Sequence, residues 1–479
     1  MPRILSPHHS LAEVQKDLFS GKFTCKELVQ SYLDRIAKNK HINAFLEVFS
    51  EESLRIAGEI DMKITNGGQG KLAGMVIGIK DNLCYKNHKI SASSKILEGF
   101  VSLYSATVVD RLRKEDAIII GRCNCDEFAM GSSNENSAFG NVLNPLDHSK
   151  VPGGSSGGCV AAVAADLCLA ALGTDTGGSI RQPASLCGVV GMKPTYGRVS
   201  RYGAIAYASS FDQIGPIAKN IEDTAIIMEV IAGKDDYDST VSSKPIPLYS
   251  KELHNNLSQI KVAYITDCLE KEGLDSEIKS KTIDTINQLK QRGHIVEPVP
   301  FPYLDYLVPA YYVLTTAEAS SNLSRYDGIN YGYRSPNATD LESTYKKSRA
   351  EGFGKEVKRR IMLGTFVLSA GYYDAYYSKG QKVRRILQEK TNEILKKYDF
   401  ILLPTTPGTA FPIGKNTADP ITMYLEDIFT VQANLTGLPA ISLPIGKHSN
   451  GLPFGIQLIG RNFEESSLLA FSNYLMNNN

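Results

Sequence analysis

The 479-residue sequence has almost no net charge and no apolar segment long enough to cross a membrane. Its 52 lysines and arginines are balanced by 51 aspartates and glutamates, so the chain has no general attraction to nucleic acid or to an anionic membrane. The apolar run 159–172 is too short for a bilayer span and contains Asp166. Residues 1–10 lack the apolar core of a signal peptide. These absences favour a soluble, cytoplasmic protein without a membrane partner.

Several motifs that bind metals or nucleotides are also missing. The eight cysteines form no CxxC pair, and the eight histidines do not cluster with them, so the sequence predicts free thiols rather than a metal site. The chain has no P-loop, no GxGxxG motif after a strand and no HExxH motif. We therefore expect no metal ion and no cofactor in this chain.

A glycine- and serine-rich stretch is the strongest feature that is present. Two clusters, residues 153–158 and 177–179, stand on either side of the apolar run 159–172. Such segments are often flexible linkers, but a linker does not lead into an apolar run that must be buried. Glycine-rich loops leave backbone N–H groups free to meet negative charge. The stretch can therefore present Ser155 and Ser179 among free donors, as an acyl-transfer site requires.

Lys80 follows an apolar segment, residues 72–79, that is typical of a central strand. A lysine at a strand end is ordinarily a surface residue, but ligand sites of α/β proteins also lie beyond the carboxyl ends of strands. Residues 153–157 match G-x-S-x-G, yet 148–152 make a poor preceding strand, which disfavours a Ser-His-Asp triad. A buried, neutral lysine can instead act as the base for a serine. With two serines available, one can relay the proton between Lys80 and the other.

The order of the expected elements predicts one large α/β unit, because helices and strands alternate and no repeat or clear linker interrupts them. A strand–helix–strand unit is expected over residues 260–299. Residues 341–397 are expected to be mostly helical and carry a surplus of lysine and arginine. That surplus fits either a solvated helical face or a contact to an anionic substrate group or partner.

Three features together resemble the amidase signature family. They are Lys80, the Gly-Gly-Ser-Ser-Gly-Gly loop at 153–158 and the Thr-Asp-Thr-Gly-Gly-Ser-Ile-Arg segment at 174–181. The match covers residue types, order and the spacing of the two serines. Four further segments look like one branch of that family, the glutamine-hydrolysing subunits of tRNA-dependent amidotransferases; they are residues 192–203, 210–216, 352–360 and 372–377.

The resemblance extends over essentially the whole chain and implies its domain organisation. It implies a single amidase-signature domain over residues 1–479, with a mixed central β-sheet covered by helices on both faces. Within it we expect N-terminal helices at about 10–65 and a catalytic core at about 72–220. The C-terminal part, about 260–479, would complete the sheet and the substrate pocket.

The resemblance also implies the catalytic roles. Ser179 would attack the γ-amide of glutamine, and Lys80 would be the neutral base. Ser155, held by a non-proline cis peptide, would relay the proton between them. Backbone N–H groups of Thr176, Gly177 and Gly178 would form the oxyanion hole. Water would then hydrolyse the γ-glutamyl ester.

Recognition of glutamine is assigned by the same resemblance. Arg360 would bind the α-carboxylate, with Arg359 as the second choice, since an arginine fork suits a carboxylate. Asp427 would bind the α-ammonium, and Tyr311 would line the pocket.

The resemblance implies partners as well. Ammonia would pass through a tunnel to a B subunit, which would use ATP and Mg²⁺ to amidate misacylated glutamyl-tRNA(Gln), aspartyl-tRNA(Asn) or both. The B subunit would make most tRNA contacts, and a small C subunit would wrap the other two. Two alternatives remain open at this point: a stand-alone amidase with the same triad, and a non-catalytic scaffold that keeps only the fold.

Overall fold

A mixed β-sheet runs through the protein in the computed structural model, which describes residues 5–254, 259–415 and 420–478. Within those residues eleven strands pair in the order β1-β3-β2-β4-β6-β5-β10-β11-β9-β7-β8. Their bounds are β1 Phe45–Val48, β2 Val76–Lys80, β3 Ile118–Cys123, β4 Ala170–Asp175, β5 Val190–Lys193, β6 Gln213–Ala218, β7 Lys261–Ile265, β8 Ile295–Val299, β9 Phe400–Pro404, β10 Ala440–Lys447 and β11 Pro453–Ile459.

The centre of the catalytic half is a set of three parallel strands, β3, β2 and β4. All three are buried along their whole length, as expected for strands covered on both faces. β4 pairs antiparallel with β6, and β9, β7 and β8 are again parallel, so the sheet is mixed. Because β2 and β4 are parallel neighbours, their carboxyl ends, at Lys80 and Asp175, lie at the same edge of the sheet.

Alternate residues of the strands enter two separate cores. In β9, Phe400 and Leu402 belong to one buried cluster, and Ile401 and Leu403 belong to the other. Successive side chains of a strand point to opposite faces, so each face of the sheet has its own apolar layer. The predicted α/β fold with a mixed sheet flanked by helices is confirmed.

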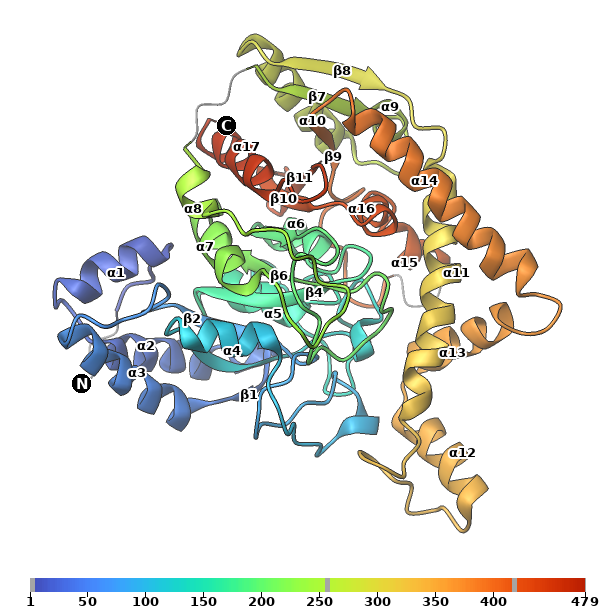
Figure 1. Cartoon of the computed structure of the whole chain (residues 1–479), viewed down its shortest axis with the longest axis horizontal. Coiled ribbons are helices and arrows are strands. Elements are labelled where there is room, and N and C mark those ends of the chain that lie inside the picture. The colour runs from blue at the N-terminus through green and yellow to red at the C-terminus, as the bar shows by residue number, and fades with distance from the viewer. Residues whose placement is uncertain (1–4, 255–258, 416–419, 479) are drawn as a thin grey trace.

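The helices lie around this sheet, with α1 to α3 at one end and α11 to α14 at the other (Figure 1). None of the helices in the described part of the chain is long and apolar enough to span a bilayer. The helices are α1 Leu11–Phe19, α2 Cys25–Lys38, α3 Ser50–Thr65, α4 Thr107–Lys114, α5 Gly157–Ala164, α6 Arg181–Cys187, α7 Ile221–Ile231, α8 Tyr249–Glu252, α9 Thr266–Leu269, α10 Ser276–Gln291, α11 Leu304–Asn322, α12 Leu341–Gly352, α13 Lys355–Val367, α14 Lys379–Leu395, α15 Pro420–Leu425, α16 Val431–Thr436 and α17 Glu465–Asn477.

Two of the sequence expectations about local structure are confirmed. Residues 260–299 form β7, the short α9, α10 and β8, and the two strands pair in parallel, as a strand–helix–strand unit predicts. Residues 341–397 are mostly helical, in α12, α13 and α14. The apolar run 159–172 is more complex than a single element, because α5 ends at Ala164 and β4 begins only at Ala170. Asp166 makes the turn between them with a φ of +58°.

The sequence does not predict two elements next to the site, the strand β6 and the helix α11. Each lacks the usual sequence pattern of its type for a physical reason. β6 contains Pro216, and proline inside a run argues against a central strand. α11 contains Pro309 and buries residues on most of its circumference, so its apolar positions form no single stripe.

The close packing of β5 and β6 predicts a cost for a single methyl group. A Cβ at Gly215 of β6 would lie 2.1 Å from the backbone oxygen of Met192. We expect Gly215→Ala to lower the free energy of unfolding by about 2 kcal/mol, because a crowded core must shift to admit it. The matched control is Gly58→Ala in α3, where a Cβ would meet nothing within 4 Å. Thermal unfolding of both variants checks this, and equal melting temperatures would contradict it.

Candidate active site

The amine of Lys80 lies buried among hydroxyl groups at the end of β2. Its Nζ is 2.7 Å from Ser155 Oγ, 3.1 Å from Ser156 Oγ and 3.0 Å from Thr174 Oγ1. Burial lowers the pKa of Lys80, an effect that nearby acidic groups only partly oppose. A neutral amine within hydrogen-bond distance of Ser155 can accept the proton of that hydroxyl, which is the requirement for a general base.

The Ser155 loop is built from glycines that allow close backbone approach. The Gly154–Ser155 peptide bond is cis, as the resemblance implied. A Cβ at Gly154 would lie 2.1 Å from the Asp126 carboxylate, and one at Gly158 would lie 2.3 Å from the Asn124 carbonyl oxygen. The N–H of Asp126 donates to the Ser155 carbonyl at 3.2 Å. Only glycine fits at these two positions, so the loop has one arrangement against the segment that follows β3.

The Ser179 loop is organised by the buried carboxylate of Asp175 at the end of β4. This carboxylate accepts hydrogen bonds from the N–H of Gly178 at 2.8 Å and from Nε and Nη2 of Arg181, each at 3.0 Å. Burial would raise the pKa of Asp175, but Arg181 lowers it to about 2. The N–H of Ser156 donates to the Ser179 carbonyl at 3.1 Å, which joins the two serine loops. Lys80, the Ser155 loop that it contacts and the Ser179 loop joined to it together form the catalytic cluster.

The predicted oxyanion donors are in two different states. The N–H of Gly178 is already bound to Asp175 at 2.8 Å. The N–H groups of Thr176 and Gly177, and that of Ser179 itself, have no acceptor among the described residues. Free, fixed N–H groups beside a nucleophile are what stabilises an oxyanion. The oxyanion hole stays a prediction, and Thr176 and Gly177 are better placed for it than Gly178.

Tyr311 and Thr430 hold the other side of the Ser179 loop. A Cβ at Gly177 would lie 2.5 Å from the Tyr311 hydroxyl oxygen, so this side chain of α11 lies directly against the loop. Thr430 Oγ1 donates to the Gly177 carbonyl at 2.6 Å. Tyr311 thus lies beside the loop that carries Ser179, as a residue lining the pocket should.

Arg360 is buried in α13 within a cage of aromatic rings. Its Nε donates to Glu356 at 2.9 Å and its Nη1 to the Tyr207 hydroxyl at 2.9 Å, while Nη2 has no acceptor among the described residues. The guanidinium carbon lies 5.1 Å from the Tyr312 ring centroid and 5.6 Å from that of Tyr424. Such a guanidinium is fixed in place and keeps one edge for a carboxylate.

The structure distinguishes the two candidate arginines. Arg360 and Arg359 both line a cavity of about 190 Å³, together with Gly131 and Ser133. Both arginines are paired with Glu356, but the Arg360 side chain is 4% exposed and that of Arg359 is 37% exposed. The more buried, more constrained Arg360 is therefore the better carboxylate ligand of the two.

Asp427 is buried close to Arg360 in the segment between α15 and α16. Its carboxylate accepts a hydrogen bond from Ser132 Oγ at 2.6 Å. Burial raises the pKa of Asp427 to about 8, although Ser132 and the charge of Arg360 oppose the rise. A carboxylate short of hydrogen-bond donors in a buried site is suited to bind a cation.

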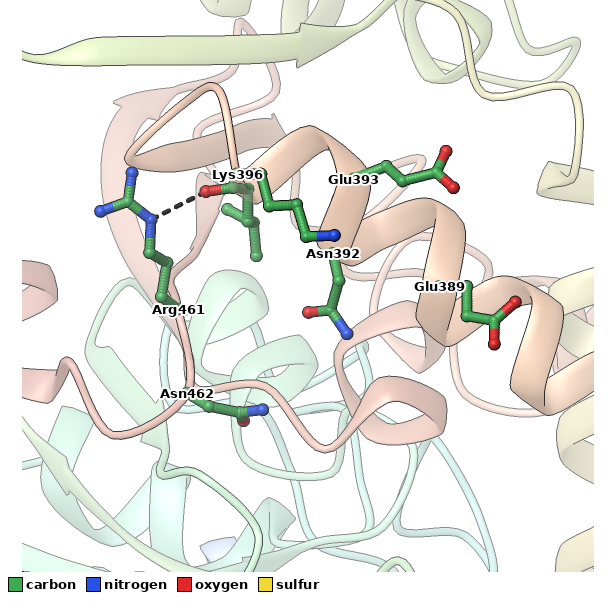
Figure 2. A pocket seen from close by; sticks show the side chains of 7 residues that line it. Glu389, Asn392, Glu393, Lys396, Arg461 and Asn462 are labelled. Atoms are coloured by element: carbon green, nitrogen blue, oxygen red, sulfur yellow. Dashed lines mark hydrogen bonds between the residues drawn. The ribbon is translucent and has the colours of Figure 1, made fainter.

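Sequence reasoning missed several residues that hold this site together. Ser132 contacts Asp427, and Tyr207 contacts Arg360. Asp126 contacts the Ser155 loop. Ser132 is 295 residues from Asp427 along the chain, so no local spacing could have indicated that pair. A wider pocket has a volume of about 760 Å³ and shares no residue with the catalytic cluster. Asn392, Lys396 and Arg461 are among the residues that line it (Figure 2).

Two serines, a buried lysine and free backbone donors define a site for acyl transfer from an amide or ester. The Amidase family model matches residues 27–469. The chain is 51% identical to the A subunit of glutamyl-tRNA(Gln) amidotransferase from Chlorobium luteolum, over 97% of this chain and 96% of the relative. It is 50% identical to the corresponding protein of the same name from Chlorobaculum tepidum, over 98% and 97%.

Solved structures agree with this similarity. The A subunit of glutamyl-tRNA(Gln) amidotransferase from Thermotoga maritima matches with a TM-score of 0.79 and 42% identity, over 95% of this chain and 92% of that one. A peptide amidase of Stenotrophomonas maltophilia matches with a TM-score of 0.80 and 29% identity, over 98% and 96%. The chain belongs to the amidase family and, within it, to the group of amidotransferase A subunits, which confirms the resemblance found in the sequence.

The surroundings of Lys80 predict that it acts as a base. We expect Lys80→Met to lower amide hydrolysis about 10³-fold, since general-base catalysis contributes on that order. Lys193 is the matched control, because it is also a buried lysine at a strand end, and among the described residues its Nζ donates only to the Pro194 carbonyl, at 2.8 Å. Lys193→Met should keep its activity. Equal loss in both variants would contradict a catalytic role for Lys80.

Proposed function

We propose that this chain is the glutamine-hydrolysing subunit of a tRNA-dependent amidotransferase and supplies ammonia for the amidation of misacylated tRNA. The observation that carries the proposal is the position of a buried arginine and a buried aspartate beside the serine loops. Arg360 is near enough to Asp427 for its charge to lower the pKa of that carboxyl. A guanidinium and a carboxyl group at fixed positions match the α-carboxylate and α-ammonium of a free amino acid, which a simple amide lacks.

The reaction would begin with two proton transfers. Neutral Lys80 accepts the proton of Ser155, and Ser155 accepts that of Ser179. The Ser179 oxygen then bonds to the γ-carbonyl carbon of glutamine, whose oxygen becomes an oxyanion held by the N–H groups of Thr176 and Gly177. When the intermediate collapses, the C–N bond breaks and the proton returns through Ser155 to the leaving nitrogen. Ammonia and a γ-glutamyl ester result.

The second half of the reaction repeats the relay with water. Water loses a proton to the Ser155–Lys80 pair and attacks the ester carbonyl. The bond to Ser179 breaks, and its oxygen recovers the proton. Glutamate leaves, and the site returns to its starting state. The proton that leaves with ammonia is replaced by one from water, and both pass through Ser155 and Lys80, so no external base is required.

The proposal includes partner subunits. The similar proteins are named as the A subunit of an amidotransferase, which implies that further subunits complete that enzyme. The net charge of +1 and the lack of a P-loop in this chain suit a subunit that neither binds ATP nor carries most tRNA contacts. We propose that a B subunit uses ATP and Mg²⁺ to amidate glutamyl-tRNA(Gln), aspartyl-tRNA(Asn) or both, and that a small C subunit binds to both other subunits.

Replacement of Ser179 tests the proposed function directly. We expect Ser179→Ala to lower ammonia release from glutamine by at least about 10³-fold, because no nucleophile remains. Ser185→Ala is the control: Ser185 is also buried and accepts the N–H of Gly455 at 2.9 Å, outside the catalytic cluster. Faster turnover of a primary amide without α-carboxylate and α-ammonium groups than of glutamine would favour the stand-alone amidase. If the intact assembly hydrolyses neither glutamine nor the primary amide, the chain is better described as a non-catalytic scaffold.

The raised pKa of Asp427 predicts a pH dependence of binding. With a pKa of about 8, Asp427 is mostly protonated at pH 7, and the α-ammonium of glutamine must displace that proton. We expect glutamine to bind more tightly as pH rises from about 6.5 to 8.5, with about one proton released per glutamine bound at the lower pH. Calorimetry on Ser179→Ala in buffers of different ionisation enthalpy measures this release. Proton release that persists in Asp427→Asn would contradict the assignment.

A further inference from the structure

Glu127 is a buried carboxylate that takes no part in the reaction described above. It lies in the segment between β3 and α5 and is 2% exposed. Its two oxygens accept the backbone N–H of Gly354 at 2.9 and 3.1 Å, and Ser94 Oγ donates to it as well. Burying a carboxylate is costly unless hydrogen bonds replace its lost hydration. The contacts to Gly354 and Ser94 provide that replacement, and the question is what they hold in place.

Gly354 is the residue that caps the N-terminus of α13. The backbone N–H of this N-cap residue has no acceptor within the helix, and Glu127 supplies that acceptor from another part of the chain. A Cβ at Gly354 would lie 2.3 Å from Glu127 Oε2. The φ of Gly354 is −71°, which any residue can adopt, so glycine is needed here only to leave room for the carboxylate.

The helix that Glu127 holds is the one that carries the arginines of the cavity. Glu356, Arg359 and Arg360 all lie within the first two turns of α13. A displacement of the helix start therefore moves the Arg360 guanidinium relative to the Tyr207 hydroxyl that fixes it at 2.9 Å. A bidentate contact to a carboxylate depends strongly on such geometry.

The segment that carries Glu127 also contacts the catalytic serine loop and Asp427. The N–H of Asp126, the preceding residue, donates to the Ser155 carbonyl at 3.2 Å. Ser132, a few residues later, donates to Asp427 at 2.6 Å. One short segment therefore holds three parts of the site: the proton relay, the aspartate and the start of α13.

We propose that Glu127 is a positioning residue for substrate selection: it fixes the start of α13 so that Arg360 meets the α-carboxylate of glutamine at a set distance from the serines. This inference rests on the proposed glutamine pocket. Burial raises the pKa of Glu127 to about 7, against the hydrogen bonds from Ser94 and Gly354 and the charge of Lys358. A neutral acceptor at this position should therefore work nearly as well as a charged one.

The kinetic split between KM and kcat tests this role with the full chain and its partner subunits. We expect Glu127→Ala to raise KM for glutamine about tenfold, the effect of weakening one charged hydrogen bond, with kcat within about twofold. Glu127→Gln, whose amide oxygen can still accept the Gly354 N–H, should keep KM within about twofold. Hydrolysis of butyramide, which has no α-carboxylate, should not change. A fall in kcat for both substrates would overturn the proposal.

Asp223 provides a matched control for the loss of a buried helix cap. It is also 2% exposed, and its carboxylate accepts the N–H of Leu11, the first residue of α1, at 3.0 Å. Asp223→Ala should lower the melting temperature about as much as Glu127→Ala and leave KM for glutamine unchanged. If Asp223→Ala raised KM equally, the effect of Glu127 would be general destabilisation, and the proposal would fail.

Gly354→Ala approaches the same contact from the other side and serves if Glu127→Ala does not fold. Its methyl group must displace the Glu127 carboxylate, so KM for glutamine should rise. In the double variant the second change should add little, because the contact is already lost. If the two changes raise KM independently, so that their fold-changes multiply in the double variant, Glu127 and Gly354 do not act through a shared contact.

Arg360→Ala separates a failure of this inference from a failure of the proposed function. If Arg360→Ala leaves KM for glutamine unchanged, the glutamine pocket itself is wrong. If Arg360→Ala raises KM but Glu127→Ala and Gly354→Ala do not, the pocket stands and the positioning role of Glu127 is rejected.

Discussion

The burial of the Lys80 amine without a carboxylate partner is the constraint on which the rest of the site depends. The Nζ atom has only three hydroxyl groups, Ser155, Ser156 and Thr174, within hydrogen-bond distance among the described residues. An ammonium ion there would lose its hydration without gaining a counter-ion in direct contact, so burial favours the neutral amine. A neutral lysine is a base, and a base beside a serine makes that serine a proton relay.

The loops around this amine are held by contacts that leave no room for side chains. Cβ atoms at Gly154, Gly177 and Gly178 would collide with Asp126, Tyr311 and Thr430, respectively. Each collision partner comes from a different part of the chain, so the glycines are where separate elements converge on the serines. The Asp175–Arg181 pair then fixes the Ser179 turn from within the core, since both side chains are fully buried. The result is a preorganised site rather than a flexible loop.

The sequence predicts the catalytic cluster better than the substrate pocket, and for a physical reason. Lys80 follows a recognisable apolar strand, and the serines lie in glycine-rich loops whose backbone chemistry is local. The sequence also indicates the mixed α/β sheet, because most of its strands are apolar runs. The roles of Arg360 and Asp427 depend on contacts with residues far along the chain, Tyr207 and Ser132, which the sequence does not reveal. Pro216 in β6 and the burial of α11 on most of its circumference contradict the usual local patterns, so only the folded structure shows that these elements frame the site.

The most direct test of the central claim is to trap the acyl-enzyme. The full chain and its partner subunits are incubated with glutamine and hydroxylamine, and parallel samples without hydroxylamine are quenched in acid for peptide mass mapping. We expect γ-glutamyl hydroxamate in the first sample and a glutamyl group on Ser179 in the second. Hydroxamate formed from simple amides but not from glutamine would contradict the account, as would a glutamyl group on any other residue.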